Sequence, residues 1–271
     1  SAFEAGRSSL LPASRSDTRS EQSVFPQSGS IYDTLYADHD YEGESSWVKT
    51  MVDRYKLSDS STLLDLGCGT GRHLECLRTS FTVEGLDIDQ SMLAEAARRL
   101  PGIPLHEGDF TDFDLSRQFD VVTCMLSSIG YARRPAGLAK VVRHMARHTR
   151  VGGVILIEPW LPPDQTQAEA MSARVVERDG QKISRMRTVH TEDGASILVY
   201  DYLVTTAEDV IHFIERHELG IFSREQYLAV CTAAGLRTFY EPIGPSGIGA
   251  YIGVRLDDTG QPPSPGAPPV L

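Results

Sequence analysis

The sequence predicts an α/β protein with a mostly parallel sheet that carries helices on both faces. Three observations predict this fold. Short apolar runs alternate with helical patterns over residues 61–160, a loop with three glycines follows the first apolar run, and strand-like runs separated by turn signals occupy residues 173–219. Alternating strands and helices form a doubly wound parallel sheet, whereas strand runs joined by tight turns form an antiparallel meander.

The expected elements follow one another in a regular order. Strands are predicted at 61–66, 81–88, 104–109, 119–126 and 151–160, and helices at 71–79, 90–100 and 135–149. The turn signals Asp179-Gly180 and Asp193-Gly194 then separate the runs of the meander. A helix at 223–235 and two strands at 236–242 and 250–256 complete the first sheet, and the last strand is expected to be antiparallel.

The bulk composition excludes several classes of function. The formal net charge is -11 and the pI about 5.2, so a polyanionic nucleic acid is not an expected partner. No run reaches the ~20 apolar residues that span a bilayer, and no signal-peptide pattern is present. The cysteines lack the spacing of metal ligands and are expected to be reduced core residues of a cytoplasmic protein without a metal site; they are Cys68, Cys76, Cys124 and Cys231.

The glycine loop is the strongest single signal for function. Gly67, Gly69 and Gly71 follow a buried strand and precede a helix, so the backbone can turn sharply and lie against a ligand. A dinucleotide-binding loop would have glycine or alanine where this chain has Arg72, and a P-loop would end in Gly-Lys-Ser/Thr. The chain has instead Asp-x-Gly-x-Gly-x-Gly, with Asp65 on the strand.

This pattern resembles motif I of the class I S-adenosylmethionine-dependent methyltransferases, whose sheet is Rossmann-like. The resemblance implies that Asp87 binds the cofactor ribose, that Asp109 lies near the adenine amino group, and that Met92 packs on the adenine. Asp87 is ~20 residues beyond the loop, where a ribose-binding acid is expected. Each acid alone could be a solvated strand end, but together they predict a cofactor site. Its remaining expected members are Tyr32, Tyr41, Ile88, Phe110 and Met125.

A narrower resemblance covers nearly all of residues 31–256. The stretches 31–45, 127–131, 152–160, 178–185 and 232–249 are similar to nucleotide-linked aminosugar N-methyltransferases of antibiotic deoxysugar pathways. The resemblance implies that the amine of a dTDP-aminodeoxyhexose becomes a dimethylamine in two transfers.

One position departs from that group. Members of that group have the motif Gly-Pro-Ser-Gly-Arg-Gly, whereas this chain has Ile248 at the arginine position. If that arginine holds the nucleotide diphosphate, another cation must replace it. We expect Arg185 first, with Arg187 and Arg133 after it.

Methyl transfer from a sulfonium is an in-line displacement, and positioning can supply on the order of 7–11 kcal/mol of its barrier. The attacking amine must be neutral, which burial favours. We expect Tyr131 and Tyr36 to orient it as catalytic residues, and Trp160, Ser128 and Ile248 to line the substrate site with Arg185. The sequence does not choose a base among the histidines of the meander, which are His190, His212 and His217.

The sequence alone leaves several functional hypotheses open. Ile248 leaves room for an O- or N-methyltransferase of another small natural-product scaffold. A nicotinamide-dependent oxidoreductase could use the same sheet, although Arg72 disfavours it, and a non-catalytic module could bind the cofactor as an effector. A homodimer through the meander is also expected. The predicted segments are a disordered tail (1–29), a cofactor-binding α/β core (30–160), a β insertion or lid (161–222), completion of the core (223–257) and a disordered proline-rich tail (258–271).

Overall fold

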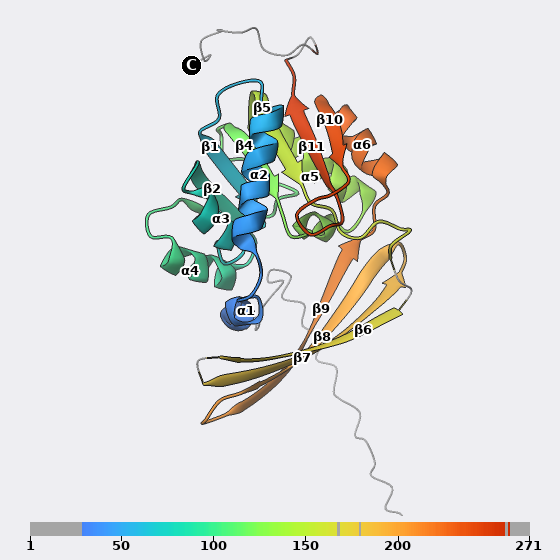
Figure 1. Cartoon of the computed structure of the whole chain (residues 1–271). Helices are drawn as coiled ribbons and strands as arrows, with labels where there is room; N and C mark the ends of the chain where they lie inside the picture. The colour runs from blue at the N-terminus through green and yellow to red at the C-terminus, as the bar shows by residue number, and fades with distance from the viewer. Residues whose placement is uncertain (1–28, 167–168, 179, 258–259, 261–271) are drawn as a thin grey trace, which may run out of the picture.

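The computed structural model describes residues 29–166, 169–178, 180–257 and 260 (Figure 1). The predicted tails, 1–29 and 258–271, lie almost entirely outside the described residues. The described residues form a seven-stranded sheet with helices on both faces and a separate four-stranded antiparallel sheet. The predicted fold class is therefore confirmed.

The larger sheet has the strand order β10-β11-β5-β4-β1-β2-β3. Its strands are β1 (Thr62–Leu66), β2 (Thr82–Asp87), β3 (Leu105–Glu107), β4 (Phe119–Cys124), β5 (Thr149–Ile157), β10 (Leu236–Glu241) and β11 (Ala250–Arg255). Strands β1 to β5 pair in parallel, whereas β11 is antiparallel to both β5 and β10. The last strand is antiparallel, as predicted. Strand β5 ends at Ile157, two residues before Pro159. The proline nitrogen carries no hydrogen, so it cannot donate a hydrogen bond to a neighbouring strand. Trp160 therefore lies in a loop.

Helices cover both faces of this sheet (Figure 1). They are α1 (Gly29–Leu35), α2 (Tyr41–Tyr55), α3 (Arg72–Leu77), α4 (Gln90–Arg99), the 3-10 helix η1 (Ser128–Ala132), α5 (Pro135–Arg147) and α6 (Arg224–Ala233). Val48 of α2 and Leu74 of α3 belong to one buried cluster, and Val141 of α5 and Tyr227 of α6 to another. Helices α1 and α2 lie in a region for which the sequence pattern predicted no element.

The smaller sheet is the predicted meander. It consists of β6 (Glu169–Arg178), β7 (Gln181–Glu192), β8 (Ala195–Thr205) and β9 (Val210–Gly220), in chain order. Asp193 and Gly194 both have positive φ, 48° and 76°, as a tight hairpin turn requires; of the other predicted turn pair, Asp179 lies outside the described residues. One face of the sheet buries Ile183 against Ile31 of α1, so α1 lies between the two sheets (Figure 1).

Candidate active site

A cavity of about 1060 Å³ opens where the carboxyl ends of β1, β2, β4 and β5 face the smaller sheet. Ligands bind at this edge in open α/β sheets because the strand-to-helix loops meet there. Its lining comes from the core, from α1 and from β7, β8 and β9. The cavity therefore joins the predicted cofactor site to the predicted lid.

The cavity brings together every predicted site residue except Gly71. The predicted cofactor residues in its lining are Tyr32, Tyr41, Asp65, Gly67, Gly69, Asp87, Ile88, Met92, Asp109, Phe110 and Met125. The predicted acceptor residues in its lining are Tyr36, Ser128, Tyr131, Trp160, Arg185 and Ile248. Gly71 precedes α3 with φ 77°, and a Cβ there would lie 2.8 Å from a methyl carbon of Leu100. This glycine therefore serves the contact between the loop and α4.

Asp87 holds the glycine loop in place. Its Oδ2 accepts a hydrogen bond from the backbone N–H of Gly69 at 2.7 Å, and its Oδ1 accepts one from the N–H of Asp89 at 2.9 Å. Gly69 has φ 54°, a left-handed conformation that glycine adopts without strain. Burial raises the pKa of Asp87. Each carboxylate oxygen keeps further acceptor capacity for hydroxyl donors in the cavity.

Asp65 is a buried acid beneath the same loop. The hydroxyl of Thr123 on β4 donates to its Oδ1 at 2.7 Å. Burial raises the pKa of Asp65 to about 6, because the charged form is poorly solvated. A positively charged ligand in the cavity would favour ionisation of Asp65.

Helix α1 is tied to the loop by contacts that the sequence analysis missed. Asp33 accepts a hydrogen bond from the Thr70 hydroxyl at 2.7 Å and forms an ion pair with Arg99 of α4. Arg99 also donates to the Thr70 carbonyl at 3.1 Å. These partners are far apart in the chain and share no local pattern. Asp33 thereby fixes the orientation of α1, which carries Tyr32 and leads directly into Tyr36.

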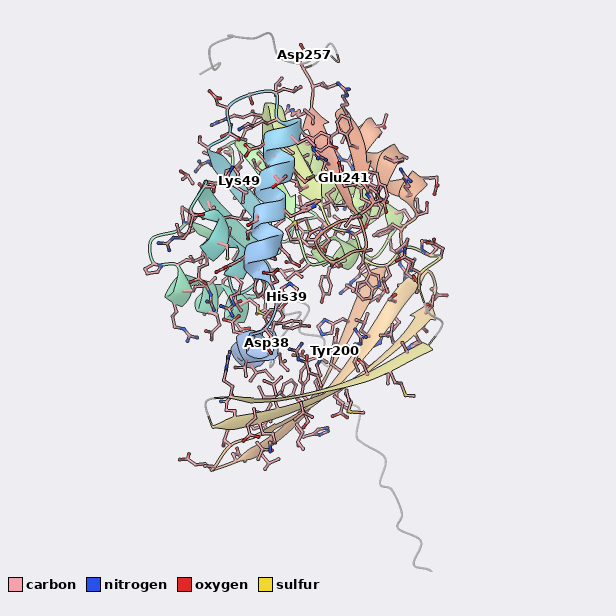
Figure 2. The ribbon with its side chains drawn as sticks, in the orientation of Figure 1. Asp38, His39, Lys49, Tyr200, Glu241 and Asp257 are labelled. Carbon is pink, nitrogen blue, oxygen red and sulfur yellow. The ribbon has the colours of Figure 1, made fainter. Side chains whose placement is uncertain are left out.

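A second missed group surrounds the buried Glu44 of α2. His73 Nε2 lies 2.7 Å from one carboxylate oxygen and His39 Nε2 lies 3.0 Å from the other; Figure 2 shows His39 beyond the end of α2. Burial alone would raise the pKa of Glu44, but the hydrogen bonds from His73 and His39 outweigh it and lower the pKa. Tyr41 packs edge-on against both rings, so this group positions one wall of the cavity.

The acceptor end of the cavity is aromatic and cationic. The Arg185 guanidinium lies 5.5 Å from the ring centre of Tyr36 and 5.0 Å from that of Tyr200, and it donates to the Tyr36 hydroxyl at 3.0 Å. Figure 2 shows Tyr200 on the side of the smaller sheet that faces the core. The Trp160 indole N–H donates to the buried Ser196 hydroxyl at 2.9 Å. Of the predicted histidines, His217 lines the cavity, whereas His190 and His212 are half-exposed.

Comparison with known proteins identifies the family. Residues 63–153 match a model described as a methyltransferase domain. The chain is 38% identical over 228 residues, 83% of this chain and 96% of the relative, to dTDP-3-amino-3,4,6-trideoxy-alpha-D-glucopyranose N,N-dimethyltransferase of Streptomyces venezuelae. It is 37% identical, over 89% of this chain and 98% of the relative, to dTDP-4-amino-2,3,4,6-tetradeoxy-D-glucose N,N-dimethyltransferase of Saccharopolyspora spinosa. This chain belongs to the aminosugar N,N-dimethyltransferase family.

Solved structures of this family share the fold. DesVI of Streptomyces venezuelae superposes with a TM-score of 0.80 at 37% identity, over 84% of this chain and 98% of that one. An amino pentose methyltransferase from Micromonospora echinaspora, solved with S-adenosylmethionine bound, superposes with a TM-score of 0.75 at 32% identity, over 83% and 96%. The prediction of an S-adenosylmethionine-dependent methyltransferase is confirmed, and the oxidoreductase and non-catalytic alternatives are wrong.

The polar atoms of the cavity suit this cofactor. Within the part of the chain that the structure describes, the lining residues with a buried polar atom that lacks a hydrogen-bond partner include Tyr41 (hydroxyl), Arg72 (Nε) and Glu158 (Oε1) of the core, and Arg187 (Nε) of the smaller sheet. The Tyr41 hydroxyl and Arg72 Nε would hold the methionyl carboxylate, and Glu158 would hold the methionyl ammonium. The sequence did not predict this role for Glu158 or Arg72. Glu158 follows β5 and Arg72 begins α3, and neither belongs to a sequence motif that marks a cofactor contact.

The described residues contain neither a grouped set of metal ligands nor a membrane-spanning helix. No three His, Cys, Asp or Glu side chains among them are grouped as metal ligands. None of the helices that they form is long and apolar enough to cross a bilayer.

Proposed function

We propose that this protein transfers two methyl groups in succession from S-adenosylmethionine to the amino group of a dTDP-linked aminodeoxysugar. The observation that carries the proposal is one continuous cavity, lined at one end by the glycine loop and Asp87 and at the other by Tyr36, Tyr131 and Trp160. The relatives named for this reaction match almost over their whole lengths. A cavity of this size accommodates a cofactor and an acceptor together.

In this proposal the acceptor amine lies between Tyr36 and Tyr131, the predicted catalytic residues. Positioning can supply on the order of 7–11 kcal/mol of the barrier to such a displacement. Burial raises the pKa of Tyr131 well above its usual value, so its hydroxyl stays protonated and acts by hydrogen bonding. Trp160 and Ser128 complete the walls around the sugar.

The nucleotide diphosphate needs a cation other than the arginine that Ile248 replaces. We assign it to Arg133, which precedes α5, and Lys140 in the second turn of α5, both of which line the cavity, because a helix N-terminus favours anions. Arg185, which we expected first for this role, is held between two aromatic rings. We assign it to the sugar side of the acceptor, with Arg187 behind it.

Mass spectrometry of turnover tests the proposal. The protein is incubated with S-adenosylmethionine and a panel of dTDP-3-aminosugars, dTDP-4-aminosugars and the matching free aminosugars. We expect one and then two added methyl groups on a dTDP-aminosugar, and slower reaction of the free sugar. Methylation of an unrelated scaffold, with every aminosugar unchanged, would contradict the substrate assignment and leave the cofactor site intact.

We further propose that two copies associate through the outer face of the smaller sheet. That face exposes a group of apolar side chains, namely Met171, Val175, Met186, Leu203 and Ile214. Exposed apolar side chains gathered on one face of a sheet are typical of interfaces. Sedimentation of the wild type and of a Met186→Lys variant tests the dimer, since the variant should shift the protein to monomer.

We also propose a cytoplasmic location. All four cysteines are free, which suits a reducing compartment. Fractionation of the producing cells tests this location.

A further inference from the structure

Strand β9 buries two ionisable side chains on the face that meets the core. Phe213, Glu215, His217 and Leu219 alternate along this strand, and each is less than a tenth exposed, with 4% for Glu215 and 2% for His217. Alternate residues of a strand share one face. Apolar side chains would be expected at all four positions, because burying an ionisable group costs free energy unless it has a suitable partner. The pair therefore needs an explanation beyond packing.

Contacts link this pair to the cavity. The Tyr131 hydroxyl lies 2.9 Å from Nδ1 of His217, and Nε2 of His217 lies 3.6 Å from Oε2 of Glu215. Tyr131 and His217 both line the cavity. The Tyr200 ring meets the imidazole edge-on, with the two ring centres 5.2 Å apart. The three side chains thus form a line from the acceptor end of the cavity into the smaller sheet.

The nearby carboxylate favours one direction for the hydrogen bond between Tyr131 and His217. A carboxylate facing Nε2 favours the imidazole tautomer that carries its proton there. Nδ1 then has a lone pair, which accepts the hydrogen of the Tyr131 hydroxyl. A phenol oxygen accepts as well as donates, so a group in the cavity can donate a hydrogen bond to Tyr131.

We infer that Tyr131, His217 and Glu215 form a proton relay that removes a proton from the acceptor ammonium. The inference rests on the proposed N-methylation. The ammonium N–H gives its proton to the Tyr131 oxygen while the hydroxyl proton of Tyr131 passes to Nδ1 of His217. The freed nitrogen lone pair forms the new N–C bond as the C–S bond breaks and its electron pair stays on sulfur.

The relay also explains how a second transfer becomes feasible. The first transfer leaves a protonated secondary amine, which must lose a proton before it can attack again. The same route accepts that proton once His217 has released the first one to solvent. Glu215 stabilises the imidazolium in the meantime by its opposite charge.

The groups around His217 decide how the relay should respond to pH. Tyr131 faces it from η1, Tyr200 from β8 and Glu215 from its own strand, and Arg187 of β7 is the cross-strand neighbour of Tyr200. Tyr200 and Tyr131 stay neutral near pH 7, because burial raises the pKa of both hydroxyls. The acceptor amine is therefore the group whose protonation should change the rate.

Rates of three variants across pH test the relay. They are Tyr131→Phe, His217→Gln and Glu215→Gln, with His190→Gln as the matched control on the same sheet. Rates on a dTDP-aminosugar that the wild type methylates are measured from about pH 6 to about pH 9 with saturating S-adenosylmethionine. Calorimetric titration of the cofactor checks that each variant keeps a folded site.

We expect Tyr131→Phe and His217→Gln to lower the rate about 100-fold near pH 7, a usual contribution of a positioned acid or base. The loss should shrink toward high pH, where the amine arrives as the free base. Glu215→Gln should give a smaller loss with the same trend, and His190→Gln should behave as the wild type.

Other outcomes would overturn the relay, and one of them would also overturn the proposed function. An equal loss of rate at every pH would mean that the three side chains only hold the smaller sheet against η1. An unchanged rate would mean that they take no part in catalysis. Either result would overturn the relay and leave the proposed function standing. If His217→Gln does not fold, Tyr131→Phe decides, since it removes a single oxygen atom. A wild-type protein that methylates no aminosugar would overturn the proposed function and the relay with it.

Discussion

Replacing Asp87 by Ala should weaken cofactor binding by at least about 100-fold, which corresponds to about 3 kcal/mol. The carboxylate already accepts one backbone N–H on each oxygen, from Gly69 and from Asp89. If both ribose hydroxyls also donate to it, the substitution removes two hydrogen bonds to a charged group, each contributing about 1.5–3 kcal/mol. It also leaves the N–H of Gly69 without its acceptor in the loop that contacts the ligand. Both effects lower affinity.

Calorimetric titration with S-adenosylmethionine and with S-adenosylhomocysteine measures this loss. Asp87→Asn should lose less affinity, about tenfold, because its amide oxygen still accepts a hydrogen bond but carries no charge. Glu107→Gln is the matched control: Glu107 ends the neighbouring strand β3 but is not among the residues that line the cavity. Unchanged affinity in a folded Asp87→Ala protein would refute the assignment of this carboxylate to the cofactor. If that variant does not fold, Asp87→Asn decides.

Three further outcomes are expected. Burial raises the pKa of Asp65 to about 6, and a cationic cofactor favours its ionised form, so affinity for S-adenosylmethionine should rise between about pH 5 and about pH 7. Calorimetric titrations at several pH values should show a flatter dependence of affinity on pH for Asp65→Asn. A wild-type affinity that does not change with pH would contradict this expectation. Asp33→Ala should weaken cofactor binding about tenfold by freeing α1 from the glycine loop, whereas Asp38→Ala should not, because Asp38 is exposed in the turn after that helix. Trp160→Phe should lower the free energy of unfolding by about 2 kcal/mol in urea titrations by leaving the buried Ser196 hydroxyl unpaired, and adding Ser196→Ala should recover part of that loss.

The elements that a local pattern specifies were predictable from the sequence. Strands β1, β2 and β4 are short apolar runs, and each has a cavity residue at or next to its carboxyl end: Asp65 is the next-to-last residue of β1, Asp87 ends β2, and Met125 follows β4. Their positions follow from topology, because parallel strands bring their carboxyl ends to one edge. For this reason the predicted cofactor residues converge in the structure, although no distance between them could be read from the chain.

Pairs that are distant in sequence were not predictable. The hydrogen bond between Asp33 and Thr70 joins residues 37 positions apart, and no periodicity marks either one. The sequence also could not show which of the three histidines of the meander faces the cavity. All of them lie on strands, but only the packing of the smaller sheet against the core reveals that His217 faces the cavity while His190 faces solvent. Gly71 shows the opposite case, because a motif position that suggested ligand contact instead serves packing against α4.

Helix α1 connects the two halves of the site. It has only seven residues, too few to be stable without tertiary contacts, so its position depends on what holds it. Asp33 binds it to the glycine loop through Thr70, and Tyr36, the first residue after the helix, accepts a hydrogen bond on its hydroxyl from Arg185 of the smaller sheet. A ligand that orders the glycine loop therefore also orders the helix face that meets the acceptor. It follows that the Asp33→Ala variant should lose affinity for the aminosugar as well as for the cofactor, although Asp33 itself is not among the residues that line the cavity.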